Sequence, residues 1–94
     1  MEEIAELLED LSGDNSKNVV DKAMDKLIQI GAGQDDPILI PFIEDAVRKA
    51  AFESDFIWLA WLKELVQKMS IEELLSPKTS SLLNFEEMLG GIQF

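Results

Sequence analysis

The chain of 94 residues contains no cysteine and no histidine. Without cysteine it can form neither a disulfide bond nor a metal site built on thiolates. Without histidine it lacks the commonest general base and the commonest nitrogen ligand for metals. We therefore expect a protein that is not an enzyme and that needs no metal or other cofactor.

Basic residues are scarce, because eight Lys and Arg stand against nineteen Asp and Glu and give a net charge of −11 at pH 7. Proteins bind nucleic acid through Lys and Arg that release counterions from the phosphates, so this balance argues against a nucleic-acid partner. A basic protein is the natural complement of such a field, and its binding should weaken in salt. The apolar fraction of 47% is too high for a disordered acidic tail and predicts a globular domain.

Long apolar runs are absent as well. The run FIWLAWL at residues 56–62 is far too short to span a bilayer, and Lys63 and Glu64 end it. The first residues, MEEIAELLEDL, are acidic and lack the cationic start and the cleavage site of a secretory signal. We therefore expect a cytoplasmic protein that has no membrane partner.

The central feature of the sequence is the segment DFIWLAWLKELVQKM at residues 55–69. On a helical wheel one arc is apolar along its whole length, with Trp58, Leu59, Leu62, Leu65, Val66 and Met69. In the first half the opposite arc is apolar too, with Phe56, Ile57, Ala60 and Trp61. This pattern predicts a helix docked on a core whose first half needs another cover: the chain's own C-terminal tail, a second copy, or a partner.

Apolar residues at three- and four-residue spacing predict further helices at residues 2–11, 18–30 and 36–51. The expected signals at helix ends are Gly13 and the segment GAG at 31–33 as stops, Asp36 and Pro37 as a start, and Ser54 as the cap of the helix at 55–69. Pro41, one turn into its helix, predicts a bend there.

Residues 70–94 carry local signals instead of a long periodic pattern. The segment SIEE at 70–73 has the form of a capping box, with Met69 and Leu74 as its hydrophobic staple, and predicts one or two helical turns before Pro77. Residues 78–81 are interpreted as a loop, and NFEE at 84–87 repeats the capping-box pattern. The apolar residues between Leu82 and Phe94 predict a tail that folds back over the first half of the helix at 55–69.

Together these elements predict one all-α domain over residues 1–94. We expect a first helical hairpin at 2–33, a second at 36–69, and short helices with a C-terminal capping tail at 70–94. The hairpins would stack either as a short solenoid or as a bundle of four to six helices.

The junction between the two hairpins has a recognisable pattern. A helix ends in LIQIG at 27–31, an Asp-Pro cap opens the next at 36–37, a second proline follows at 41, and an isoleucine-glutamate pair stands at 43–44. In these features the chain resembles HEAT-like helical repeat proteins, with about two divergent repeats over residues 2–69. The insertion at 32–35, and Val20 where an arginine is expected, depart from that pattern. The resemblance implies a solenoid that binds other proteins along its stacked helices.

Oxygen-bearing side chains between the first two predicted helices match the offsets of an EF-hand calcium loop: Asp10, Ser12, Asp14, Ser16, Asn18 and Asp21. However, Asn15 stands where the sharp turn needs glycine, Lys17 stands at the hydrophobic position, and Asp21 replaces the closing glutamate. Any turn between helices contains polar residues, so we interpret this segment as a capped turn and expect no metal site.

The candidate partner-binding residues are Phe56, Ile57 and Trp61, with Glu44 and Asp45 as an acidic rim. The simpler interpretation is that these three apolar side chains are core beneath the tail. As a contact surface they predict a non-enzymatic protein-protein interaction module, an adaptor or scaffold, that binds a protein partner. Two alternatives stay open: a small acidic inhibitor or immunity-type protein that blocks a basic active site or nucleic-acid-binding surface, and a homodimer that covers the apolar half-helix.

Overall fold

The structure is a computed structural model that describes residues 2–13, 15–33 and 39–84. Within these ranges the chain forms α1 (Glu2–Glu9), α2 (Lys17–Gly33), α3 (Ile40–Phe52), α4 (Phe56–Met69), the 3-10 helix η2 (Glu72–Leu74) and α5 (Pro77–Leu83). The all-α class predicted from the sequence is therefore confirmed for the described residues. None of their helices has both the length and the apolar character needed to cross a membrane.

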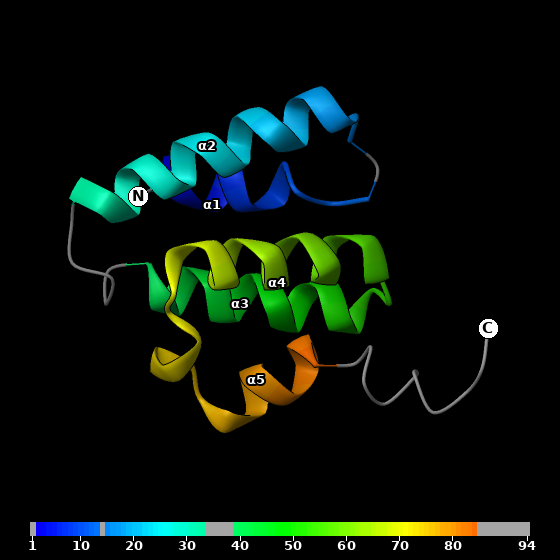
Figure 1. Cartoon of the computed structure of the whole chain (residues 1–94). Helices are drawn as coiled ribbons and strands as arrows, with labels where there is room; N and C mark the ends of the chain where they lie inside the picture. The colour runs from blue at the N-terminus through cyan, green and yellow to red at the C-terminus, as the bar shows by residue number, and fades with distance from the viewer. Residues whose placement is uncertain (1, 14, 34–38, 85–94) are drawn as a thin grey trace.

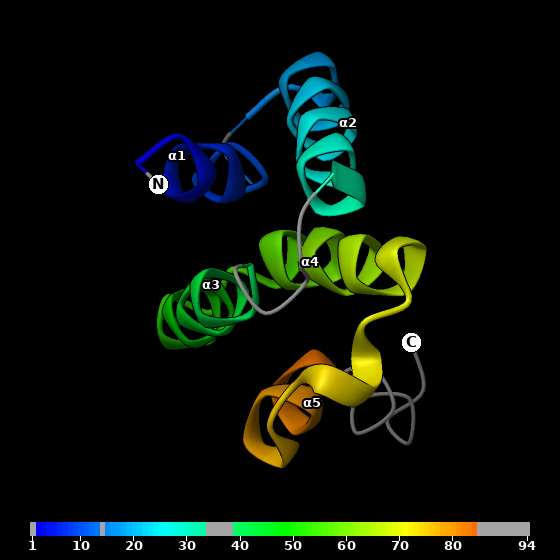
Figure 2. The same cartoon turned by 90° about the vertical axis from the view of Figure 1, so that its left-hand side faces the viewer.

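The helices are arranged in three layers (Figure 1, Figure 2). Helices α1 and α2 form the first layer, α3 and α4 form the second, and α5 lies on the far side of the second. Helix α1 contacts α3, α2 contacts α4, and α5 contacts both α3 and α4. The second hairpin is therefore covered on both of its faces.

The core lies between these layers, and α4 supplies the largest part of it. Its buried side chains are Trp58, Leu59, Leu62, Leu65 and Val66. Helix α3 adds Ile43, Ala46, Val47 and Ala50. The buried face of α4 is the one that its helical wheel predicts, and each large side chain withdrawn from water contributes about 1.5–3 kcal/mol.

Helices α3 and α4 end in the same backbone motif. Ser54 and Ser70, which follow them, have φ angles of 55° and 56°, in the left-handed region. After α3, the N–H groups of Ser54 and Asp55 donate to the carbonyls of Ala51 and Ala50. After α4, the corresponding donors are Ser70 and Ile71, and the acceptors are Gln67 and Val66. Both ends are Schellman motifs with serine at the position that glycine usually takes.

Two predicted caps are therefore wrong. Helix α4 is capped by Asp55 and not by Ser54, since the Asp55 side chain accepts a hydrogen bond of 3.0 Å from the backbone N–H of Trp58. Ser70 does not open a capping box, because it closes α4, and no side-chain cap bond precedes η2. Leu74, expected in a staple, is exposed.

The predicted loop at 78–81 is also wrong, because these residues lie inside α5. Ser76 caps this helix by accepting a hydrogen bond of 3.3 Å from the N–H of Thr79. Pro77 follows at the first helical position, where its lack of an N–H costs no hydrogen bond. The NFEE pattern lies outside the described residues apart from Asn84.

Helix α2 ends at Gly33, within the segment 31–33 that the sequence predicts as its stop. A Cβ atom at Gly31 would lie 2.2 Å from Cε of Met69 and 3.2 Å from Cδ1 of Leu39. The glycine thus allows the end of α2 to pack closely against the end of α4. The predicted start at residues 36–37 lies outside the described residues. Pro41 falls in the first turn of α3 as described, so it gives no reason for the predicted bend there.

Candidate protein-interaction surface

The turn between α3 and α4 carries three exposed apolar side chains. Phe52 is the last residue of α3, and Phe56 and Ile57 are the first two of α4. Their exposed fractions are 91%, 52% and 58%. Because only three residues join the two helices, these side chains belong to one corner of the fold (Figure 1). We call Phe52, Phe56 and Ile57 the corner patch.

The backbone beneath the corner patch is held by Asp55. Its Oδ1 accepts from the N–H of Trp58 and its Oδ2 accepts from the N–H of Gly13, each at 3.0 Å. A Cβ atom at Gly13 would lie 3.3 Å from Cβ of Ile57. The connection between α1 and α2 therefore lies directly against the start of α4, and the corner patch stands on a fixed backbone.

The corner patch adjoins an open groove of about 490 Å³ along α4. The groove, which we call the α4 groove, is lined by Ile57, Ala60, Trp61, Lys63, Glu64 and Gln67. Ile57, Ala60 and Trp61 are spaced as neighbours on one helix face, and Trp61 is partly buried against the core. The structure thus brings the predicted residues Ile57 and Trp61 together, with Phe56 beside them in sequence.

Glu44, predicted as part of an acidic rim, faces α5 instead. One carboxylate oxygen, Oε2, accepts hydrogen bonds from the N–H of Ser76 at 2.8 Å and from the hydroxyl of Thr79 at 3.2 Å. The Ser76 N–H is the main reason that the pKa of Glu44 lies below its ordinary value. This carboxylate ties α3 to the start of α5.

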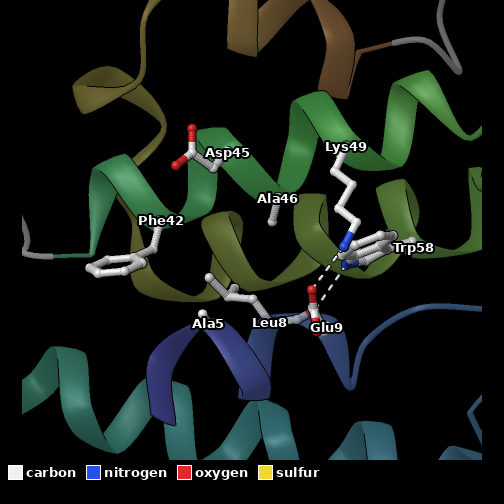
Figure 3. Close-up of a pocket in the computed structure, with 8 residues that line it drawn as sticks. All are labelled: Ala5, Leu8, Glu9, Phe42, Asp45, Ala46, Lys49 and Trp58. Atoms are coloured by element: carbon white, nitrogen blue, oxygen red, sulfur yellow. Dashed lines mark hydrogen bonds and ion pairs between the residues drawn. The ribbon is translucent and has the colours of Figure 1, made fainter. Parts of the chain in front are cut away.

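Asp45 forms an ion pair with Arg48 and lines a separate cavity of about 250 Å³ (Figure 3). This open cavity lies between α1, α3 and α4, and Phe42, Ala46 and Trp58 are among its lining residues. The structure therefore does not bring Glu44 and Asp45 to the α4 groove. The acidic residues at the corner patch itself are Glu53 and Asp55.

Two polar contacts border the same cavity. Nζ of Lys49 lies 2.9 Å from Oε1 of Glu9, and this contact raises the pKa of Lys49 (Figure 3). Nε1 of Trp58 donates a hydrogen bond of 2.9 Å to the carbonyl of Leu8. The ion pair joins α1 to α3 and the indole joins α4 to α1, so both contacts hold the first two layers together.

Among the residues that the structure describes, no three acidic side chains are grouped closely enough to hold a metal ion. Asp14 of the EF-hand-like pattern lies outside those residues. Of the remaining positions, Asp10, Ser12 and Ser16 lie between α1 and α2, and Asn18 and Asp21 lie in α2.

Phe52 is the surface residue that sequence reasoning missed. The predicted helix ended at Ala51, so Phe52 was assigned to no face. Its position on the wheel was the available signal, because it lies away from the buried face of Ile43, Val47 and Ala50.

Comparisons of the chain with protein-family models, with curated proteins and with solved structures found no match.

Proposed function

We propose that this protein is a non-enzymatic interaction module that binds another protein through the corner patch and the adjoining α4 groove. The observation that carries the proposal is the exposure of Phe52, Phe56 and Ile57 at one corner. Single exposed apolar residues are ordinary, whereas three within six positions at one turn are a stronger indication of an interaction site. A partner that buried these side chains would gain about 1.5–3 kcal/mol from each.

The rigidity of the corner supports the same proposal. The Schellman motif fixes the backbone after Phe52, and the Asp55 carboxylate fixes the backbone before Ile57. A surface that is already ordered loses little conformational entropy when it binds. Aromatic anchors on such a surface are typical of the residues that dominate binding energy.

The acidic residues around the corner patch favour a partner with basic residues. Glu53 and Asp55 lie between Phe52 and Phe56, and the whole chain carries a net charge of −11. We therefore expect a partner with an apolar pocket bordered by Lys or Arg. Membership of the HEAT-like class is part of this proposal, and the packing of α1 on α3 and of α2 on α4 is compatible with stacked repeats.

The test is a pull-down from a lysate of the source cells, with the immobilised protein washed at low and at high salt. The variant Phe52→Ser/Ile57→Ser removes the patch. The matched control Val19→Ser/Leu74→Ser removes two other exposed apolar side chains, on α2 and η2. We expect one partner to remain at high salt on the wild type and the control, and to be lost from the patch variant.

Two outcomes would contradict the proposal. A partner that all three proteins retain equally at high salt does not use the corner patch. A partner that salt releases from all three alike is held by charge, and that result would favour the acidic inhibitor instead.

A further inference from the structure

The α4 groove continues into a second groove beside α5. The second groove includes Val66, Leu75, Leu83 and Asn84 among its lining residues. Lys63 and Gln67 line both grooves, so the two adjoin. Together they form one channel along α4, which leads from Asn84 to Ile57 at the corner patch.

We propose that residues 85–94 of the same chain occupy this channel and cover the α4 groove. Their sequence, FEEMLGGIQF, directly follows Asn84. Because Asn84 itself lines the channel, the segment begins where the channel begins. The last turn of α5 points toward the end of the bundle that carries the α3–α4 turn (Figure 1).

The length of the segment fits the channel. From Gln67 to Ile57, α4 advances about 15 Å, at roughly 1.5 Å per residue. The ten residues 85–94 reach about 15 Å as a helix and about 33 Å when extended. When extended, the segment is therefore long enough to pass Gln67 and reach Ile57.

The chemistry of the segment also fits. Its apolar residues Phe85, Met88, Leu89, Ile92 and Phe94 would meet the apolar lining of the channel. Its two carboxylates, Glu86 and Glu87, follow Asn84 closely and can reach Lys63. Lys63 stands where the grooves join and forms no ion pair with any residue that the structure describes.

A second copy of the chain is the weaker occupant. Two chains that each carry −11 repel one another. A tethered segment instead acts at an effective concentration in the millimolar range without any association step. Because the channel ends at the corner patch, the segment would also compete with a protein partner. That consequence rests on the proposed function, whereas occupancy of the channel does not.

Disulfide trapping in the full chain tests the occupancy. The natural sequence has no cysteine, so only an introduced pair can react. We would compare Ala60→Cys/Leu89→Cys with the control Lys26→Cys/Leu89→Cys, whose first position is exposed on α2. The expected result is a disulfide within one chain that forms at least about tenfold faster in the first variant, as its closer approach requires. Equal rates would overturn the proposal, and so would a product made mainly of linked dimers.

Tryptophan emission gives an independent readout. Trp58 is only 2% exposed, so acrylamide quenching reports mainly on Trp61. The change Met88→Asp/Leu89→Asp should increase quenching in the wild-type chain and leave it unaltered in a Trp61→Phe chain. Quenching that the change leaves unaltered in both chains would refute the proposal that residues 85–94 cover the α4 groove. The same variant should bind more partner in the pull-down, and failure of that step alone would count against the function and not the occupancy.

Discussion

The backbone N–H of Gly13 donates a hydrogen bond of 3.0 Å to Oδ2 of Asp55, a residue 42 positions away. The other oxygen of the same carboxylate caps α4 through the N–H of Trp58. One side chain therefore begins the central helix and fixes the first hairpin to it. Because Asp55 fixes the start of α4, it also fixes the backbone position of Ile57, two residues further on.

Replacing Asp55 by alanine should lower the free energy of unfolding by about 2 kcal/mol, because one helix cap and one charge-assisted hydrogen bond are lost together. Asp55→Asn keeps one acceptor oxygen and should lose less. Ser54→Ala, at the cap position predicted from the sequence, should stay within about 0.5 kcal/mol of the wild type. Urea denaturation measures all three, and equal losses at positions 54 and 55 would contradict the assignment.

Ser70→Gly should raise the stability of the chain. A residue with a side chain is strained at a φ angle of 56°, whereas glycine adopts this conformation freely. After the greater entropy of unfolded glycine is subtracted, we expect a gain of about 0.5–1 kcal/mol. Thermal unfolding should show a midpoint higher by about 2–8 °C for a domain of this size. Ser70→Ala is the control and should give no such gain; if it matches Ser70→Gly, strain is not the cause.

The effect of Gly31→Ala on the free energy of unfolding should depend on Met69. Alanine favours a helix interior by about 1 kcal/mol over glycine, but its Cβ would lie 2.2 Å from Cε of Met69. In a Met69→Ala background that conflict is absent, so the same substitution should be more favourable there, by less than about 1 kcal/mol because the end of the Met69 side chain can move aside. The four chains of this cycle can be compared by urea denaturation. An effect of Gly31→Ala that is the same in both backgrounds would rule out the close packing of α2 on α4.

Much of the fold can be predicted from the sequence because burial follows the helical period directly. The buried face of α4, from Trp58 to Val66, is visible in the spacing alone. The surplus apolar side chains Phe56, Ile57 and Trp61 are visible in the same way, as residues left over on the opposite arc. The periodic pattern indicates which face of a helix is buried, but it does not indicate which element covers that face.

Helix ends were harder to predict because one residue type has more than one use there. Serine is a good N-cap, yet Ser54 and Ser70 both take left-handed positions after a helix. The choice depends on how tightly the chain must turn, which is set by packing. Ser76 and Pro77 did carry a start signal, but α5 is only seven residues long, too short for a periodic pattern to support it.

The role of Glu44 could not be predicted from its surroundings in sequence. Its partners Ser76 and Thr79 are 32 and 35 residues away. On the helical wheel it is a polar residue opposite the core, and the solvent-facing interpretation is the natural one. Only the docking of α5 on α3 brings the hydrogen-bond donors Ser76 and Thr79 to this carboxylate.

Because Glu44 helps to hold α5 on α3, the stability of the chain should depend on pH. The hydrogen bonds from Ser76 and Thr79 favour the charged carboxylate, so the pKa of Glu44 in the folded chain lies below its ordinary value of 4.5. Since the folded pKa is the lower of the two, the stabilisation is complete above the unfolded pKa. It is lost as the pH falls through the folded pKa.

Glu44→Gln should therefore be less stable than the wild type by about 1 kcal/mol at neutral pH, a value reduced by the partial exposure of the site. The gap should narrow as the pH falls below about 4.5, because the wild type alone loses the charge. Urea denaturation from neutral pH to the lowest pH at which the chain stays folded measures this gap. Glu73→Gln, an exposed carboxylate on η2, should stay within about 0.5 kcal/mol of the wild type at neutral pH. A gap for Glu44→Gln that stays constant over the whole range would mean that the charge of Glu44 does not hold α5 in place.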